Sequence, residues 1–173
     1  MSLARIIYIA RNPKDTAVSL YYMMKLMPVF GNYIKSWNHS YQLFFSGKVG
    51  FGDWFDHVLD WNKHNEEDNI IFVKYEDMKK DIRATIKKIA LFLDIEVTDD
   101  VMQRIVEYSS IKKMRENKAV NLMKGNVDNH TVSFIRKGIV GDWVNHFTVA
   151  QDAHFEKMYE KRMKGSGLVF DFY

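Results

Sequence analysis

The chain has 173 residues with 25 basic and 22 acidic side chains, so its formal net charge is +3. Hydrophobic residues make up 47% and charged residues 27%, which is ordinary globular usage and excludes disordered, collagenous and low-complexity proteins. The absence of cysteine excludes disulfides and thiolate zinc sites, and no apolar run approaches the roughly 20 residues of a membrane helix, so a soluble cytoplasmic protein is expected.

The first half of the chain predicts two strands and three helices. Residues 5–10 and 70–75 are continuous β-branched and apolar runs, which indicate strands buried on both faces and therefore parallel. A helix is expected from about Asp15 until Pro28, and amphipathic helices over 33–46 and 53–64. The predicted class is α/β, with a parallel sheet flanked by helices.

The second half predicts mainly helices. One helix is expected from residue 76 to 93, a second after the capping residue Thr98, and a terminal one from the capping box at Thr148 to about residue 164. Residues 117–138 are expected to be a long irregular loop. Two strands are too few for a parallel sheet, and no glycine-rich phosphate loop is present, so we expect the C-terminal part of a larger domain.

Positive charge is concentrated in residues 109–137. This segment has seven basic and two acidic side chains, a net charge of +5, whereas the segments on either side are each at −1. Such a segment is either a solvated basic loop or the binding site of an anion. Nucleic-acid binding is not expected, because the basic stretch is short and flanked by acidic segments.

Three features suggest an anion site at the strand ends. Arg11 follows the first strand and Ser19 lies on the next helix, where a guanidinium and a hydroxyl can hold phosphate oxygens. The alternative for Arg11 is an ordinary ion pair with Asp15. Tyr75 follows the second strand, and the segment 134–138 places an Arg-Lys pair before a glycine that allows close approach to a phosphate. An aromatic ring beside an anion receptor suggests a nucleotide.

The six histidines are scattered without the spacing of metal ligands, and no Ser/His/Asp arrangement is apparent. No metal is therefore expected.

Several motifs in order resemble the cytosolic sulfotransferases, which transfer a sulfuryl group from 3′-phosphoadenosine 5′-phosphosulfate (PAPS) to hydroxyl or amine acceptors and leave adenosine 3′,5′-bisphosphate (PAP). The matching segments are residues 7–19, 75–78, 136–143 and 147–151. The resemblance implies a P-loop NTPase-like sulfotransferase fold, of which residues 1–173 form the C-terminal part of a single domain, and a small apolar acceptor such as a phenol, alcohol, steroid or amine.

The resemblance also implies the residues of a cofactor site. In the family, the Arg and Ser of the A-R-N-x-x-D-x-x-x-S segment and the R-K-G motif bind the 3′-phosphate, while the Tyr of Y-E-D-M and a later short segment contact adenine. The residues implied here are Arg11, Ser19, Tyr75, Ser109, Ile111, Met114, Phe134, Arg136, Lys137 and Gly138. By the same analogy, residues 23–33 and 121–130 are candidate acceptor-side loops.

Three departures from the family pattern matter. The P-K-S-G-T loop and the catalytic His and Lys are absent, so no catalytic residue is assigned, and a truncated, inactive paralogue that binds PAP or a protein partner is the alternative. Ile111 stands where the family usually has a Phe stacked on adenine. The dimer motif keeps Thr148 and Val149 but has Val144 and Ala153 in place of its Lys and Glu, which puts the family's homodimer in doubt.

Overall fold

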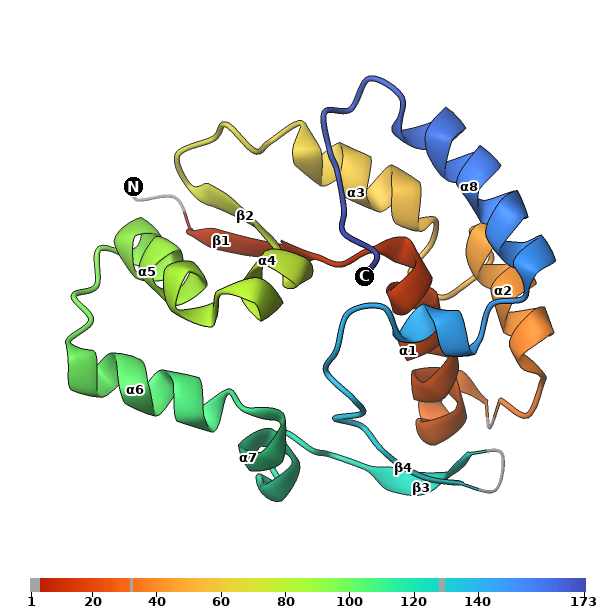
Figure 1. Ribbon diagram of the computed structural model, residues 1–173, viewed down its shortest axis with the longest axis horizontal. Coiled ribbons are helices and arrows are strands. Elements are labelled where there is room, and N and C mark those ends of the chain that lie inside the picture. Colours follow the sequence, from red (N-terminus) through yellow and green to blue (C-terminus); the bar gives the residue numbers. More distant parts are fainter. Residues whose placement is uncertain (1–3, 32, 128–129) are drawn as a thin grey trace.

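A computed structural model describes residues 4–31, 33–127 and 130–173. Figure 1 shows strands β1 and β2 side by side, with helices on either side and a separate hairpin. The helices are α1 (Pro13–Leu26), α2 (Trp37–Phe45), α3 (Trp54–Asn62), α4 (Tyr75–Lys80), α5 (Ile82–Leu93), α6 (Asp99–Tyr108), α7 (Ile111–Glu116) and α8 (Val149–Met163). Short 3₁₀ turns, η1 and η2, cover Pro28–Phe30 and Asp142–Asn145.

The parallel pair predicted from the sequence is present. Strand β1 (Ile6–Ala10) pairs in parallel with β2 (Ile70–Lys74), in a register that places Ile6 opposite Ile70 and Ala10 opposite Lys74. The prediction that both strands are buried on both faces is wrong for β1, because Ile7 and Ile9 are 39% and 52% exposed. Among the described residues the sheet has these two strands, so one face of β1 lacks a covering layer.

Two further expectations are corrected. The helix expected over 76–93 is two helices, because Asp81 leaves the helical conformation and its side chain accepts a hydrogen bond from the Ala84 amide as the N-cap of α5. The loop expected over 117–138 contains an antiparallel hairpin of β3 (Lys124–Val127) and β4 (His130–Ser133).

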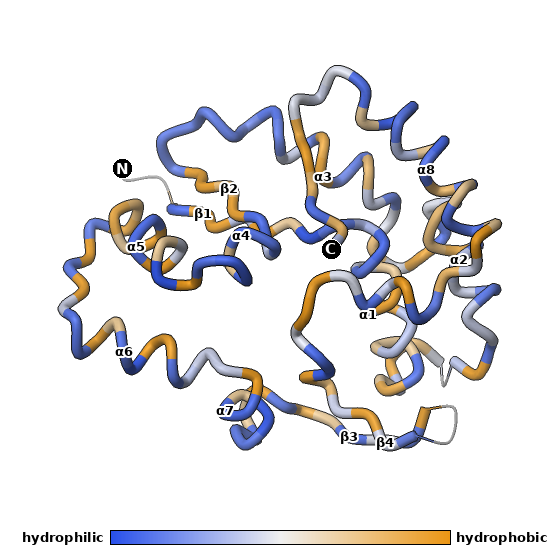
Figure 2. The backbone as a smooth tube through the Cα atoms, viewed as in Figure 1, coloured by the Kyte–Doolittle hydropathy of each residue, from blue (hydrophilic) through white to orange (hydrophobic). Residues whose placement is uncertain are grey.

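Local sequence signals account for most helix starts. Asn12 caps α1 by accepting a hydrogen bond from the Asp15 amide, and Pro13 occupies the first turn, where a missing N–H costs nothing. Thr98 caps α6, and Thr148 forms the expected capping box with Gln151 at α8. The connection from α3 to β2 is hydrophilic, as Figure 2 shows, and it crosses the surface.

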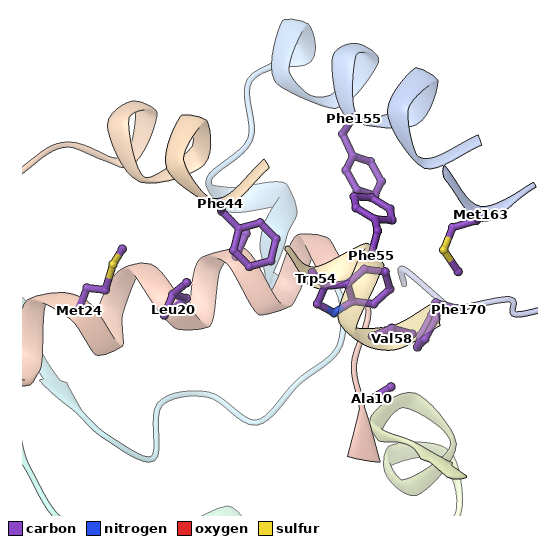
Figure 3. Packing of buried hydrophobic residues seen from close by; sticks show 11 residues of the cluster. Ala10, Leu20, Met24, Phe44, Trp54, Phe55, Val58, Phe155, Met163 and Phe170 are labelled. Atoms are coloured by element: carbon purple, nitrogen blue, oxygen red, sulfur yellow. The ribbon is translucent and has the colours of Figure 1, made fainter. Parts of the chain in front are cut away.

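The core lies between α1, α2, α3 and α8 (Figure 3). Phe155 of α8 is fully buried and points toward Phe55 of α3, while Trp54 packs against Phe170 of the C-terminal segment at 5.3 Å between ring centroids. Burial of aromatic rings is the main apolar contribution to the stability of this region. It fixes the start of α1, and with it the residues that follow β1.

Candidate functional site

The carboxyl ends of the two strands bring Arg11 and Tyr75 together. Each residue directly follows its strand, and the parallel register makes Ala10 and Lys74 neighbours. The guanidinium carbon of Arg11 lies 4.5 Å from the centroid of the Tyr75 ring, a cation–π contact. The expectation that the strand ends present an arginine and an aromatic ring side by side is confirmed.

Buried hydrogen bonds lock these strand ends to each other. The Asn12 backbone N–H and side-chain amide donate to Glu76 Oε1 over 2.7 and 3.0 Å, and both residues are almost fully buried. Desolvation by burial raises the pKa of Glu76, although the hydrogen bonds from Asn12 act in the opposite direction. The strand ends therefore form a rigid platform for the side chains that follow them.

Arg11 has both an internal role and an unused donor. Its Nη2 donates to the Ile139 carbonyl over 2.8 Å and lies 3.3 Å from Asp15 Oδ2, so the ion pair considered from the sequence exists. Its Nε is buried without a hydrogen-bond partner among the described residues. A buried N–H donor without an acceptor destabilises the fold. The Arg11 Nε–H is therefore suited to donate to an oxygen of a ligand.

The Arg136–Gly138 loop lies against the same platform. Gly138 has φ +65°, and a Cβ built on it would stand 2.0 Å from Ile111 Cδ1 and 3.8 Å from the Tyr75 hydroxyl. Glycine is required here for two reasons, because the left-handed conformation disfavours other residues and the space is filled by Ile111. Gly138, Ile111 and Tyr75 are therefore neighbours, although they are far apart in the sequence.

We expect Gly138→Ala to destabilise the fold by at least about 1 kcal/mol, since an alanine pays the left-handed penalty and must displace Ile111. Urea unfolding of the single variant, of Ile111→Ala and of the double variant separates these effects. Part of the loss should be recovered in the double variant, where the clash is relieved. Full additivity of the two single changes would contradict the close contact between Gly138 and Ile111.

The two cations of this loop share one buried carboxylate. Lys137 Nζ donates to Asp142 Oδ1 over 2.6 Å, and Arg136 Nη1 donates to Asp142 Oδ2. Desolvation by itself would raise the pKa of Asp142, but hydrogen bonds from Lys137, Arg136 and Asn145 outweigh it and hold the pKa at about 2. The carboxylate is therefore ionised at neutral pH.

Ser19 lies on the exposed side of α1. Together with Arg11 it lines a cavity of about 430 Å³. Tyr22, one turn further along α1, has its ring centroid 4.8 Å from the guanidinium carbon of Arg136. Ser19 and Tyr22 lie on the same face of α1, and Tyr22 contacts Arg136, so this face of the helix is adjacent to the basic loop.

The remaining predicted residues lie at the end of α6, in α7 and directly after β4. Ser109 is an exposed residue at the end of α6, and Met114 is a half-buried residue of α7. Phe134 is half-buried after β4, and its N–H donates to the Met123 carbonyl over 2.9 Å. Arg115 binds the Ile135 and Arg136 carbonyls, which ties α7 to the basic loop.

The basic segment does not act as a single patch. Among the other cations of this segment, Arg115 donates to backbone carbonyls, and the Lys113 ammonium lies 3.7 Å from a carboxylate oxygen of Glu107. Lys112, Lys118 and Lys124 line a different cavity, of about 810 Å³. The positive charge close to the strand ends is therefore smaller than the net charge of +5 of residues 109–137.

Two buried carboxylates contact the cations of the candidate site and were not assigned to it from the sequence. Asp15 and Asp142 are fully buried, and each contacts a cation of the site. The signal for Asp15 was its i+4 spacing from Arg11. Asp142 stood beside the R-K-G motif, but its partners could not be read from spacing alone.

The candidate acceptor loops are only partly described. Positions 32, 128 and 129, within the segments 23–33 and 121–130, lie outside the described residues. Met23 lines the cavity that contains Ser19. At the degenerate dimer motif, Val144 and Val149 are 51% and 89% exposed.

Residues 4–31, 33–127 and 130–173 contain no cluster of three His, Cys, Asp or Glu side chains that could hold a metal ion. Within the same part of the chain, the helices are too short or too polar to cross a bilayer.

Comparison with known proteins decides the family. The family model described as the sulfotransferase domain matches residues 1–167. The chain belongs to the sulfotransferase family. It is 42% identical over 172 residues to sulfotransferase 1B1 of Canis lupus familiaris and 41% identical to sulfotransferase 1 family member D1 of Mus musculus, covering 96% of this chain and 57% of each relative.

Solved sulfotransferase structures share the fold. Mouse sulfotransferase SULT7A1 complexed with PAP is 39% identical, with a TM-score of 0.81 over 94% of this chain and 59% of that one. Retinol dehydratase in complex with androsterone and PAP is 26% identical, with a TM-score of 0.85 over 96% of this chain and 49% of that one. This sulfotransferase chain therefore spans between about half and three-fifths of the length of these relatives.

Proposed function

We propose that this sulfotransferase chain binds the 3′-phosphate and the adenine of PAPS and of PAP. The phosphate would be held by Arg11, Ser19, Arg136, Lys137 and the backbone at Gly138. The adenine would contact Tyr75, Ser109, Ile111, Met114 and Phe134. The proposal rests on one observation above all, which is the Arg11 guanidinium stacked on Tyr75 beside the Gly138 loop.

The residues present fit such a ligand. Arg11 Nε is a buried donor with no acceptor in the described part of the chain. The backbone at Gly138 adopts a left-handed conformation close to the Tyr75 hydroxyl, and the Lys137 side chain is 46% exposed, so its ammonium is accessible from solvent. A doubly charged phosphate would meet two guanidinium groups, an ammonium and a hydroxyl, which are its usual protein partners.

In the mechanism, this chain contributes positioning. When bound, PAPS supplies the activated sulfuryl group. Arg11, Arg136 and Lys137 bind at the end of the nucleotide remote from that group, and such remote binding energy aligns a reacting centre. No proton transfer is assigned to the described residues, because no residue of the chain matches the catalytic His of the family.

We further propose that residues 1–173 form the C-terminal part of one sulfotransferase domain. The length of the relatives and the exposure of Ile7 and Ile9 on a two-stranded sheet support this. The longer cytoplasmic protein would transfer the sulfuryl group to a hydroxyl or amine of a small apolar acceptor. The cavity beside Ser19, lined by Met23, Phe44 and Phe51, supports an apolar acceptor.

A second candidate function is nucleotide binding without transfer, as in an inactive paralogue that binds PAP or a protein partner. The cations and the aromatic ring at the strand ends would serve this function as well, because binding alone needs no group that transfers a proton. Transfer from PAPS to a phenol or steroid by this chain would exclude it. Binding of PAP with no transfer would support it.

Calorimetric titration of the 173-residue chain with PAP and with adenosine 5′-monophosphate tests nucleotide recognition. We expect PAP to bind at least about tenfold more tightly, since only PAP offers a 3′-phosphate to charged donors. PAP at 100 times its Kd should also stabilise the fold by about 2.7 kcal/mol. Equal affinities for the two nucleotides would overturn the proposal.

A further inference from the structure

Two buried carboxylates connect the cations of the site. Asp15 Oδ2 lies 3.3 Å from Arg11 Nη2 and accepts the Gly141 N–H over 2.8 Å, while Asp15 Oδ1 accepts the Trp143 N–H over 3.0 Å. Asp142 stands between those two amides in the sequence. The same carboxylate that pairs with Arg11 therefore fixes the backbone on both sides of Asp142.

Asp142 uses both of its oxygens inside the protein. Its Oδ1 accepts from Lys137 Nζ over 2.6 Å and from Asn145 Nδ2 over 2.9 Å, and its Oδ2 accepts from Arg136. The carboxylate itself has no exposed surface, although the Lys137 side chain is 46% exposed. A ligand from solvent can therefore reach the cations while Asp142 stays behind them.

The cations retain donors for a ligand. Arg136 binds Asp142 through Nη1, and its guanidinium lies over the Tyr22 ring, which leaves further N–H groups of its five. The ammonium of Lys137 likewise has three N–H donors, of which one binds Asp142. Without the carboxylate, two adjacent positive charges would repel each other and turn toward solvent.

We infer that Asp142 is a positioning residue, which holds Arg136 and Lys137 toward one ligand phosphate and so gives the chain its preference for a 3′-phosphorylated nucleotide. This inference rests on the proposed function. A carboxylate that competed with the phosphate for the cations would have to be reachable from the ligand side. Asp142 instead is buried, and Asp15 holds the backbone on both sides of it. The hydrogen bonds from Lys137, Arg136 and Asn145 hold the pKa of Asp142 at about 2, so its carboxylate is ionised at neutral pH.

The test compares nucleotides as well as variants. In Asp142→Asn, the ratio of PAP affinity to adenosine 5′-monophosphate affinity should fall about tenfold by calorimetry, because charge-assisted contacts to the 3′-phosphate are lost. The affinity for the monophosphate should stay within about twofold, since it lacks that phosphate. A merely structural role would lower both affinities together. Asp60→Asn, an exposed carboxylate paired with Lys63, is the matched control and should keep the wild-type ratio.

A second, milder variant tests the inference even if Asp142→Asn does not fold. Asn145→Ala removes one hydrogen bond to Asp142 from an exposed residue, and we expect a two- to threefold fall in the ratio with an unchanged unfolding temperature. A wild-type chain without preference for PAP would overturn the proposed function and this inference with it. A wild-type preference that persists, or increases, in the folded variants would overturn the inference alone.

Discussion

Replacing Arg11 with alanine is expected to weaken PAP binding by about 2–4 kcal/mol, because the variant lacks a partly buried guanidinium that would contact the phosphate. Arg136→Ala should have an effect of the same size. Arg11 stacks on Tyr75 at 4.5 Å and has a buried Nε without a partner among the described residues, so its removal eliminates a preorganised donor. Calorimetric titration of each variant with PAP measures the loss.

The matched control for both arginines is Arg104→Ala, on the outer face of α6. Arg104 is 61% exposed at its side chain and pairs with Asp100 on its own helix, so PAP affinity should not change. Unfolding curves show whether each variant remains folded. Wild-type affinity for PAP in a folded Arg11→Ala variant would refute the assignment of the phosphate site.

Phe155→Ala is expected to lower the free energy of unfolding by about 3–5 kcal/mol, the usual cost of removing a large buried ring. Phe155 is fully buried and contacts Phe45, Tyr159 and Phe172 through ring centroids 5.4 to 5.8 Å apart. Its ring also lies 4.7 Å from the ammonium of Lys14. Urea unfolding at constant pH measures the change.

Phe51→Ala is the matched control for this core substitution. Phe51 is 66% exposed and makes an edge contact with Phe30, so the same chemical change should cost less than about 1 kcal/mol. Similar losses for the two variants would contradict the position of Phe155 at the centre of the core.

Much of the fold could be predicted because its signals are local. Continuous apolar runs indicated the two strands, and capping residues such as Thr98 and Thr148 indicated helix starts. The break at Asp81 was missed because neither glycine nor proline marks it, although an Asp before an apolar helix is itself a capping signal. The hairpin was missed because Lys124–Val127 has little β-propensity, and its pairing depends on tertiary contacts.

The site was predictable where topology dictates proximity. Parallel strands place their carboxyl ends at one edge, so the meeting of Arg11 with Tyr75 followed from two short runs of sequence. The contact between Gly138 and Ile111 depends on the path of the chain through α6 and α7, which no local pattern encodes. The same holds for Asp142, whose contacts with Arg136 and Lys137 depend on the path of the loop, whereas the contact of Asp15 with Arg11 was indicated by their spacing.

The C-terminal segment closes over the buried lysine at the start of α1. Lys14 is 2% exposed, its ammonium lies 2.5 Å from carboxylate oxygens of Asp152 and Glu156, and the ring of Phe172 stands 5.0 Å away. The Phe172 carbonyl accepts the indole N–H of Trp143 over 2.7 Å. We expect proteolytic removal of these last residues to expose the Lys14 ammonium, in the first turn of α1, to water and so to loosen the start of the helix that follows β1.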